Sequence, residues 1–276
     1  GRREPEGGDG VSATEIAIWR GEEEPRRFGF FTDTTTCIGC KACEVACKTW
    51  NDVPEDGVSL LATSYDNTGA LGSDTWRHVA FIEQPRPEGF RWLMSSDVCK
   101  HCTSAACLDV CPTGALVRTE FGTVVVQQDV CNGCGYCVPA CPFGVIDQRQ
   151  DDGRVWKCTL CYDRLKVGAT PACAQACPTE SIQYGDVDEL RARADRRLDA
   201  LRAAGVDDAR LYLAGEDDGV GGAGAFFLLL DDPEVYGLPP DPVTPTRDVA
   251  AAWRAAGVAA AGMVAGVALA FLGRRH

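Results

Sequence analysis

The stretch CNGCGYCVPACP, residues 131–142, decides the fold of this 276-residue chain. Its cysteines are Cys131, Cys134, Cys137 and Cys141, and a proline follows the last of them. A loop this tight can present three thiolates to three corners of a cubane, while the fourth cysteine points toward a different cluster. The C-x2-C-x2-C-x3-C-P spacing therefore predicts ligands for [4Fe-4S] clusters that occur in pairs.

The pattern recurs four times along the chain and uses all 16 cysteines. The other three sets are Cys37, Cys40, Cys43 and Cys47; Cys99, Cys102, Cys107 and Cys111; and Cys158, Cys161, Cys173 and Cys177. Each keeps the C-x3-C ending, although the second and fourth motifs have longer spacers. Zinc ribbons use a distant second C-x2-C pair, and disulfides between cysteines three apart would be strained, so both fit the repeat poorly. We expect four [4Fe-4S] clusters.

Crossed ligation requires that motifs share clusters in pairs. The compact first and third motifs must each be matched with one of the elongated second and fourth motifs. Spacing alone allows neighbouring motifs to pair, or outer with outer and inner with inner.

No catalytic constellation accompanies the cysteines. The histidines His78, His101 and His276 are scattered, and the chain has no G-x-S-x-G, P-loop or G-x-G-x-x-G motif. A net charge of −13 argues against a nucleic-acid partner.

Three basic residues lie beside ligand cysteines: Lys100, His101 and Lys157. They either raise a cluster's reduction potential or serve as exposed solubilising groups. We expect a non-catalytic electron-transfer protein.

The cysteine-rich region is flanked by segments of different character. Residues 1–27 are rich in Gly, Glu and Arg and predict an extended arm. Residues 186–205 have apolar positions at helical spacing and end at a glycine, which predicts an amphipathic helix. Residues 225–230 indicate a buried strand, and the Pro-rich residues 238–245 an extended linker.

Residues 255–272 contain no charge and would span about 27 Å as a helix, close to the thickness of a bilayer. We expect a single C-terminal membrane anchor, with Trp253 at one interface and Arg274 and Arg275 at the other. The small residues Gly262, Gly266 and Ala270 form a stripe on which another transmembrane helix could pack. A buried core helix is the alternative.

Four stretches resemble the iron-sulfur beta subunit of membrane-bound formate dehydrogenase: residues 35–52, 134–145, 154–164 and 236–242. The resemblance extends over nearly the whole chain and includes the C-terminal helix. It implies an α+β fold with two ferredoxin-like modules, each holding two clusters, one inserted in the other. The implied segments are an arm (1–27), a four-cluster domain (28–185), a helix, strand and linker region (186–248), and an anchor with a basic tail (249–276). Within the domain, the outer module covers about 28–62 and 148–185, and the inner module about 88–147.

The resemblance also implies the ligand sets. Cluster 1 would be held by Cys37, Cys40, Cys43 and Cys177; cluster 2 by Cys158, Cys161, Cys173 and Cys47; cluster 3 by Cys99, Cys102, Cys107 and Cys141; and cluster 4 by Cys131, Cys134, Cys137 and Cys111. The implied partners are a molybdenum or tungsten bis-pterin catalytic subunit and a membrane cytochrome b subunit that reduces quinone.

In that family the cluster-bearing head faces away from the cytoplasm and the C-terminal tail lies inside, so we expect a single-pass protein of the inner membrane. No signal peptide is evident in residues 1–19, and Arg2-Arg3 makes a poor twin-arginine signal, so the head would be exported with a partner. Two alternatives remain. The chain could serve a membrane hydrogenase, polysulfide reductase or dimethyl sulfoxide reductase, or it could be a non-catalytic scaffold held by zinc or disulfides.

Overall fold

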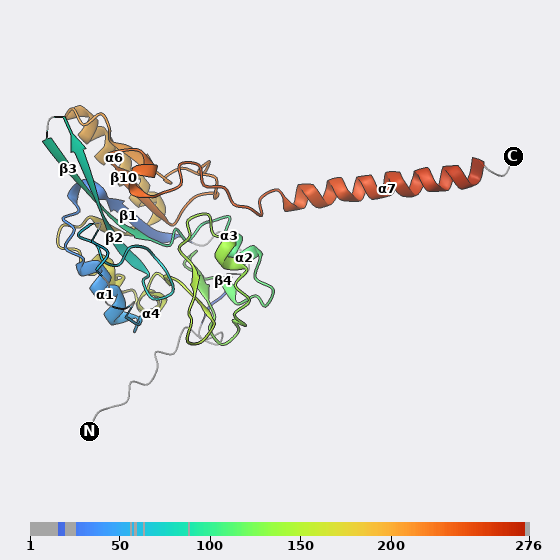
Figure 1. Cartoon of the computed structure of the whole chain (residues 1–276), viewed down its shortest axis with the longest axis horizontal. Coiled ribbons are helices and arrows are strands. Elements are labelled where there is room, and N and C mark those ends of the chain that lie inside the picture. Colours follow the sequence, from blue (N-terminus) through green and yellow to red (C-terminus); the bar gives the residue numbers. More distant parts are fainter. Residues whose placement is uncertain are drawn as a thin grey trace, which may run out of the picture. The chain divides into compact units, whose positions relative to one another are not determined.

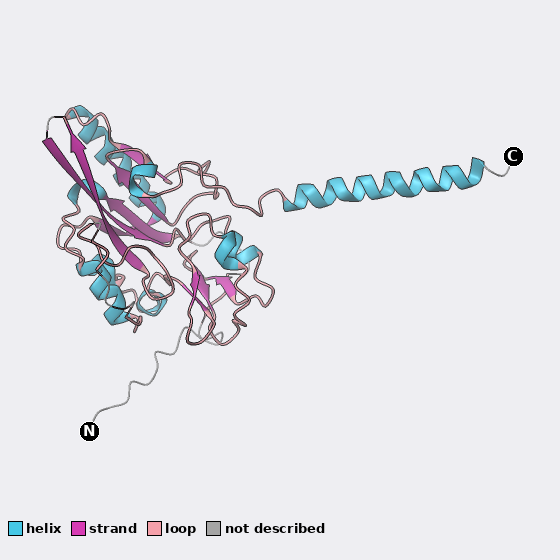
Figure 2. Cartoon of the chain, viewed as in Figure 1, coloured by secondary structure: helices cyan, strands magenta, loops and turns pink. Residues whose placement is uncertain are grey.

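The computed structural model describes residues 16–19, 26–55, 57, 60–62, 64–87 and 89–273. The chain divides into two compact units, Gly1–Thr244 and Pro245–His276. The first unit holds all 16 cysteines, and the second consists mainly of one long helix. Figure 1 gives the course of the chain, and Figure 2 shows that loops form much of the first unit.

The described helices are short apart from two. They are η1 (Thr34–Thr36), α1 (Ala42–Trp50), α2 (Ala106–Asp109), α3 (Cys137–Ala140), α4 (Tyr162–Lys166), α5 (Ala172–Gln175), α6 (Val187–Ala203), η2 (Pro233–Tyr236) and α7 (Val249–Gly273). The strands are β1 (Phe28–Asp33), β2 (Arg77–Arg86), β3 (Gly89–Val98), β4 (Leu116–Arg118), β5 (Val124–Val126), β6 (Asp147–Gln148), β7 (Val155–Trp156), β8 (Ile182–Asp186), β9 (Arg210–Tyr212) and β10 (Ala225–Leu229). Several of the helices carry cysteines of the four motifs.

A four-stranded sheet with the order β8-β1-β10-β9 is the scaffold of the first unit. β1 is antiparallel to β8 and parallel to β10, so strands from before and after the cysteine motifs lie side by side. Every residue of β10 is buried, as an unbroken apolar run in an inner strand requires. The predicted strand at 225–230 is therefore confirmed, and it belongs to the same sheet as the strands that flank the motifs.

The predicted amphipathic helix is also confirmed, as α6. The Asp186 side chain caps it by accepting hydrogen bonds from the backbone amides of Asp188 and Glu189. Gly205 follows the helix with a φ of +84°, the left-handed conformation that ends helices at low cost to glycine. Val187, Leu190 and Ala194 are buried in one core cluster with the phenylalanines of β10, so α6 covers this part of the sheet.

Three antiparallel hairpins, β2–β3, β4–β5 and β6–β7, complete the first unit. The longest is β2–β3, whose pairing runs from Arg77 opposite Val98 to Arg86 opposite Gly89. Figure 1 shows this hairpin as a long ribbon beside β1, and α1 packs against β2. The hairpin thus brings side chains from residues 77–98 to the first cysteine motif.

The second unit contains α7, which is long and apolar enough to cross a membrane. Its window of highest hydropathy is 0% buried inside the structure, so the alternative of a buried core helix is wrong for the chain as described. The basic residues Arg274 and Arg275 lie outside the described residues. So do residues 1–15 and 20–25 of the expected arm, whereas Ile18 forms an antiparallel bridge with Thr119.

Candidate iron-sulfur site

Cysteines from the first and fourth motifs surround one hollow. They are Cys37, Cys40, Cys43 and Cys177. Lys41 has a left-handed backbone (φ 58°) and ends the loop where α1 begins, so Cys43 is buried on the helix while Cys40 is exposed in the loop. Gly39 has a φ of +66°, and a Cβ atom there would lie 2.6 Å from the Phe81 ring. Only glycine suits this position in the loop.

A second group joins the last cysteine of the first motif to the fourth motif. Its members are Cys47, Cys158, Cys161 and Cys173, all of them buried. Burial raises the pKa of Cys47, and the thiolates of the other three members raise it further. Asn51 Nδ2 lies 3.8 Å from Cys47 Sγ and 3.7 Å from Cys161 Sγ, so one amide contacts thiols from both motifs.

The second and third motifs supply two further groups. Cys99, Cys102, Cys107 and Cys141 line a second hollow. Burial raises the pKa of Cys137 to about 12, and the thiolates of Cys111, Cys131 and Cys134 contribute to this shift. The structure thus gathers the 16 cysteines into four groups, and in each group one thiol comes from a different motif than the other three.

Thiols of neighbouring groups pack together: Cys43, Cys158 and Cys99, from three of the groups, share one core cluster, and Cys107 and Cys137 share another. After burial, the thiolate of Cys173 contributes to the raised pKa of Cys43, and the thiolate of Cys99 to that of Cys158. The thiolate of Cys137 contributes in the same way to the raised pKa of Cys107. Each of these pairs links one group to the next, so electrons could pass along the series from group to group.

The donor set fits cubane iron-sulfur clusters. All 16 cysteines are free, so the disulfide alternative is wrong for this structure. Four thiols converge in each group, and at buried members such as Cys47 and Cys158 desolvation opposes ionisation unless a metal centre is bound. An iron-sulfur cluster supplies reversible one-electron chemistry when bound, and the protein residues set its potential and its exposure to solvent.

The three basic residues that the sequence places beside ligand cysteines are buried. Lys100, His101 and Lys157 are 0%, 1% and 2% exposed, so the alternative of exposed solubilising groups is wrong. Lys100 pairs with Asp97, and Lys157 donates to backbone carbonyls, including that of Cys158 at 3.0 Å. Burial, followed by the charge of Lys157, holds the pKa of His101 well below its usual value, so His101 is neutral at pH 7.

Sequence analysis missed Arg77, the first residue of β2, which is 1% exposed. Burial lowers its pKa, but the thiolates of Cys173, Cys43, Cys158 and Cys47 raise it more, and the net pKa lies above the usual value. No local signal in the sequence could have identified this residue, because these cysteines lie 30 or more residues away along the chain. Ser96 escaped notice for the same reason, and its Oγ lies 3.4 Å from Cys43 Sγ.

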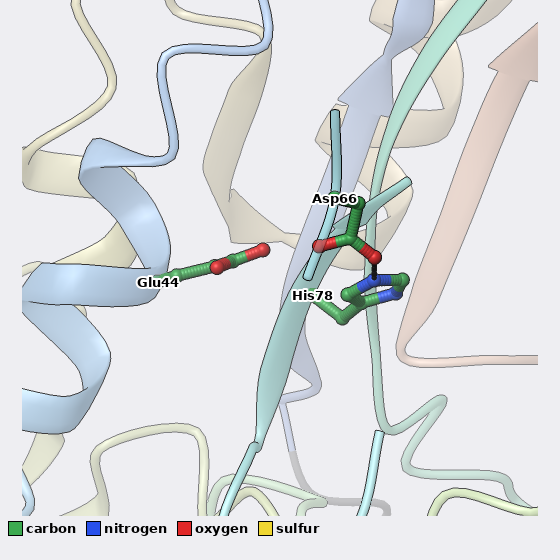
Figure 3. Close-up of side chains that lie close together, drawn as sticks. All are labelled: Glu44, Asp66 and His78. Atoms are coloured by element: carbon green, nitrogen blue, oxygen red, sulfur yellow. Dashed lines mark hydrogen bonds and ion pairs between the residues drawn. The ribbon is translucent and has the colours of Figure 1, made fainter. Parts of the chain in front are cut away.

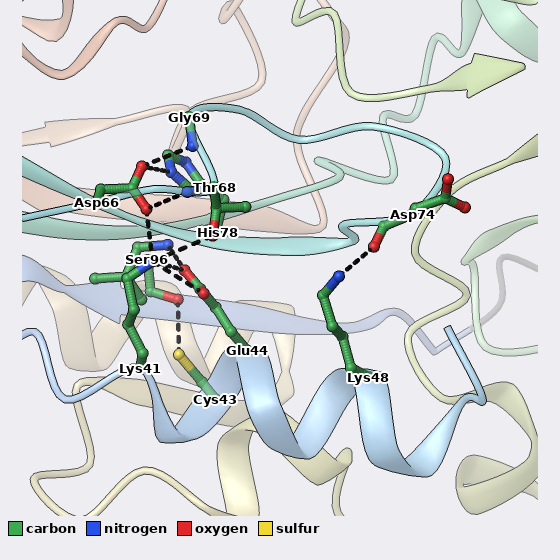
Figure 4. A network of polar contacts seen from close by, with 11 residues as sticks. Lys41, Cys43, Glu44, Lys48, Asp66, Thr68, Gly69, Asp74, His78 and Ser96 are labelled. Atoms are coloured by element: carbon green, nitrogen blue, oxygen red, sulfur yellow. Dashed lines mark hydrogen bonds and ion pairs between the residues drawn. The ribbon is translucent and has the colours of Figure 1, made fainter. Parts of the chain in front are cut away.

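Three buried side chains near the first motif, Glu44, Asp66 and His78, bring potential ligand atoms within 4.8 Å of one another (Figure 3). The ammonium group of Lys41 already provides the positive charge there, 3.1 Å from Glu44 and 2.6 Å from Asp66. Asp66 also accepts hydrogen bonds from the amides of Thr68 and Gly69 (Figure 4). The trio is therefore an ion-pair network that ties α1 to the loop before β2.

Comparison with known proteins is consistent with this geometry. Two family models match the chain, both described as a 4Fe-4S dicluster domain, over residues 36–115 and 90–187. The formate dehydrogenase iron-sulfur subunit of Haemophilus influenzae is 42% identical over 214 residues, which is 76% of this chain and 68% of that protein. The iron-sulfur subunit of the nitrate-inducible formate dehydrogenase of Escherichia coli is 41% identical over 239 residues, 84% of this chain and 79% of that protein. The B subunit of the anaerobic dimethyl sulfoxide reductase of Escherichia coli is 37% identical over 166 residues, 60% of this chain and 76% of that protein.

The dicluster domains and the grouped thiols define an iron-sulfur electron-transfer protein, which rules out the zinc or disulfide scaffold. More narrowly, the chain belongs to the family of formate dehydrogenase iron-sulfur subunits, with the dimethyl sulfoxide reductase subunits as more distant relatives. It is the electron-transfer subunit of such an enzyme and not the catalytic one. The resemblance drawn from the cysteine motifs is confirmed.

Proposed function

We propose that this chain relays electrons through four [4Fe-4S] clusters from a formate-oxidising molybdenum or tungsten bis-pterin subunit to a membrane cytochrome b subunit and quinone. The observation that carries the proposal is the packing of thiols from neighbouring groups: three of the groups contribute to one core cluster, and the third and fourth groups meet in another. Because thiols of neighbouring groups pack in the same core clusters, neighbouring iron-sulfur clusters would be close enough for direct electron transfer.

The grouping of the thiols supports the following ligand sets. Cys37, Cys40, Cys43 and Cys177 would hold cluster 1, and Cys158, Cys161, Cys173 and Cys47 cluster 2. Cys99, Cys102, Cys107 and Cys141 would hold cluster 3, and Cys131, Cys134, Cys137 and Cys111 cluster 4. The outer module of residues 28–62 and 148–185 would then enclose the inner module of residues 88–147. The pairing of β1 with β8 supports this arrangement, because it joins the two parts of the outer module.

The membrane part of the proposal rests on α7. We propose that α7 spans the inner membrane once, with the head outside the cytoplasm and the basic tail inside. Gly262, Gly266 and Ala270 would allow the cytochrome b subunit to pack closely on it, since small residues let helix backbones approach in lipid.

The test is to purify the tagged chain anaerobically from membranes with its partners, count iron per chain and assay formate-dependent dye reduction. We expect about 16 irons per chain, together with formate activity. Iron near 8 per chain would contradict four clusters.

The second candidate keeps the relay but assigns it to a dimethyl sulfoxide or polysulfide reductase, or to a membrane hydrogenase. The 37% identity to the dimethyl sulfoxide reductase subunit favours considering it, although that match covers only 60% of this chain. The same preparation decides between them, because full iron content without formate activity would favour this second candidate.

A further inference from the structure

Arg77 is a buried cation without a carboxylate partner. It is 1% exposed, and no ion pair joins it to an acidic side chain in the part of the chain that the structure describes. Its Nη1 donates to the Ser96 carbonyl at 3.3 Å and to Ser96 Oγ at 3.2 Å, and its guanidinium lies over the Phe30 ring at 4.7 Å. The Nε and Nη2 atoms have no hydrogen-bond partner among the described residues.

Among the other weakly exposed cations of the first unit, two are paired with carboxylates, and the buried Lys157 donates to backbone carbonyls. Lys41 contacts Glu44 and Asp66, and Lys100 contacts Asp97. Burying an unpaired charge costs several kcal/mol in real proteins, so a buried arginine with two free N–H groups requires a negative partner. Cation–π contact with Phe30 offsets only part of that cost.

The negative groups around Arg77 are thiolates from two different groups. Cys43 belongs to the first group, whereas Cys47, Cys158 and Cys173 belong to the second. All four pack in one core cluster with Phe30, whose ring lies under the guanidinium, and their thiolates raise the pKa of Arg77 against the effect of burial. Ser96 extends this contact, since its hydroxyl accepts from Arg77 and is 3.4 Å from Cys43 Sγ. Arg77 therefore lies at the junction of the first and second groups.

A cubane held by four thiolates carries a net charge of about −2, and reduction adds one more negative charge. A fixed cation beside it favours the reduced form and raises its potential. A cation between two such centres acts on both, and it also offsets the repulsion that reducing one would exert on the other.

We propose that Arg77 is the shared counter-charge of clusters 1 and 2 and raises the reduction potentials of both, an inference that rests on the proposed cluster assignment. Arg77 is a positioning and tuning residue rather than a ligand. Ser96 acts directly on cluster 1, through the sulfur of Cys43.

The test is an EPR-monitored redox titration of the intact complex, purified from membranes, with the wild-type chain and with Arg77→Met. Methionine fills a similar volume without charge. We expect two of the four midpoint potentials to fall by at least about 59 mV each. For a one-electron couple this shift corresponds to a tenfold change in the reduction equilibrium. The other two should stay within experimental error, and Arg77→Lys should recover most of the shift.

The matched control is Arg91→Met. Arg91 lies on the same hairpin, but it is neutralised by Asp231 at 3.4 Å and donates to the Leu230 carbonyl. This variant should leave all four potentials unchanged. Ser96→Ala should lower one of the two potentials that respond to Arg77→Met more than the other, and it should leave the remaining two potentials unchanged.

Four unchanged potentials in an Arg77→Met complex with full iron content would overturn the inference, and so would an equal fall of all four. Arg77→Met could lose iron altogether. In that case, an Arg77→Lys complex that keeps its iron and has near-wild-type potentials would support the inference that clusters 1 and 2 require a positive charge at this position. Loss of iron in both variants would overturn it, because the positive charge would then not be what the site requires. These outcomes do not depend on formate activity, so the inference and the proposed enzyme can fail separately.

Discussion

Asp66 shows how a single carboxylate joins distant parts of the chain. It contacts Lys41 at 2.6 Å and His78 at 2.6 Å, and it accepts hydrogen bonds from the amides of Thr68 and Gly69. Burial raises its pKa, but these partners lower it more, so the net pKa of Asp66 lies well below its usual value. The charged form is therefore the one that holds α1 against the loop before β2.

We expect Asp66→Asn to lower the free energy of unfolding by about 2 kcal/mol at pH 7, because it removes charge-assisted hydrogen bonds. A carboxyl with a lowered folded pKa stabilises the fold above its unfolded pKa of about 4 and loses this contribution as the pH falls. The difference between wild type and Asp66→Asn should therefore shrink below about pH 4. Thermal unfolding followed by tryptophan fluorescence at pH 7, 5 and 3.5 measures it.

Asp188→Asn is the control for this experiment, because its carboxylate is 88% exposed and, among the described residues, pairs with Arg191 alone. It should change stability little at any of these pH values. A difference between wild type and Asp66→Asn that stays constant down to pH 3.5 would contradict the role given to the Asp66 charge.

At the scale of elements, the close approach of β1 to the chain before β10 sets the geometry of the central sheet. Phe30 N donates to Gly224 O at 2.8 Å, and a Cβ atom at Gly29 would lie 2.0 Å from that same carbonyl oxygen. The neighbour is backbone, so it cannot move aside as a flexible side chain would. Glycine at position 29 is thus a packing requirement of β1.

Gly29→Ala should destabilise the first unit by about 3 kcal/mol, since overpacking in a filled core shifts backbone as well as side chains. Gly215→Ala is the matched control: the nearest atom to its added Cβ is 4.0 Å away. A fall in the melting temperature of Gly29→Ala, with none for Gly215→Ala, would support the packing argument. Equal melting temperatures for the two variants would refute it.

At the scale of the whole molecule, the cysteines are also part of the core. Cys43, Cys47, Cys99, Cys158 and Cys173 belong to one buried cluster together with Trp76 and Trp156, and Cys137 belongs to another. Clusters 1 and 2 would join segments more than 100 residues apart, so they would serve as cross-links as well as carriers.

Chelation of iron under anaerobic, reducing conditions should therefore unfold the first unit, because metal binding and folding are coupled at such sites. Circular dichroism should show loss of strand signal with helix signal from α7 retained, and limited proteolysis should cut throughout Gly1–Thr244. A metal-free chain that keeps the protease resistance of the wild type would show instead that the apolar core suffices.

Much of the site could be read from the sequence, because its information is local. Three cysteines within seven residues lie in one short segment regardless of how the rest of the chain folds. Composition alone likewise indicates that β10 is a buried strand and that α7 is apolar enough to span a membrane. The same locality explains why α6 was predicted to within two residues at each end.

The sequence by itself determined the number and type of cysteine motifs, the family and the apolar terminal helix, since each depends on residues close together in the chain. Only the tertiary structure decided that Lys100, His101 and Lys157 are buried, that Lys41 neutralises Glu44 and Asp66, and that Arg77 faces thiols of two groups. The physical reason is that burial and charge pairing depend on which distant segments meet. β2 and the cysteines around Arg77 are brought together by the sheet and the hairpin, not by their order in the chain.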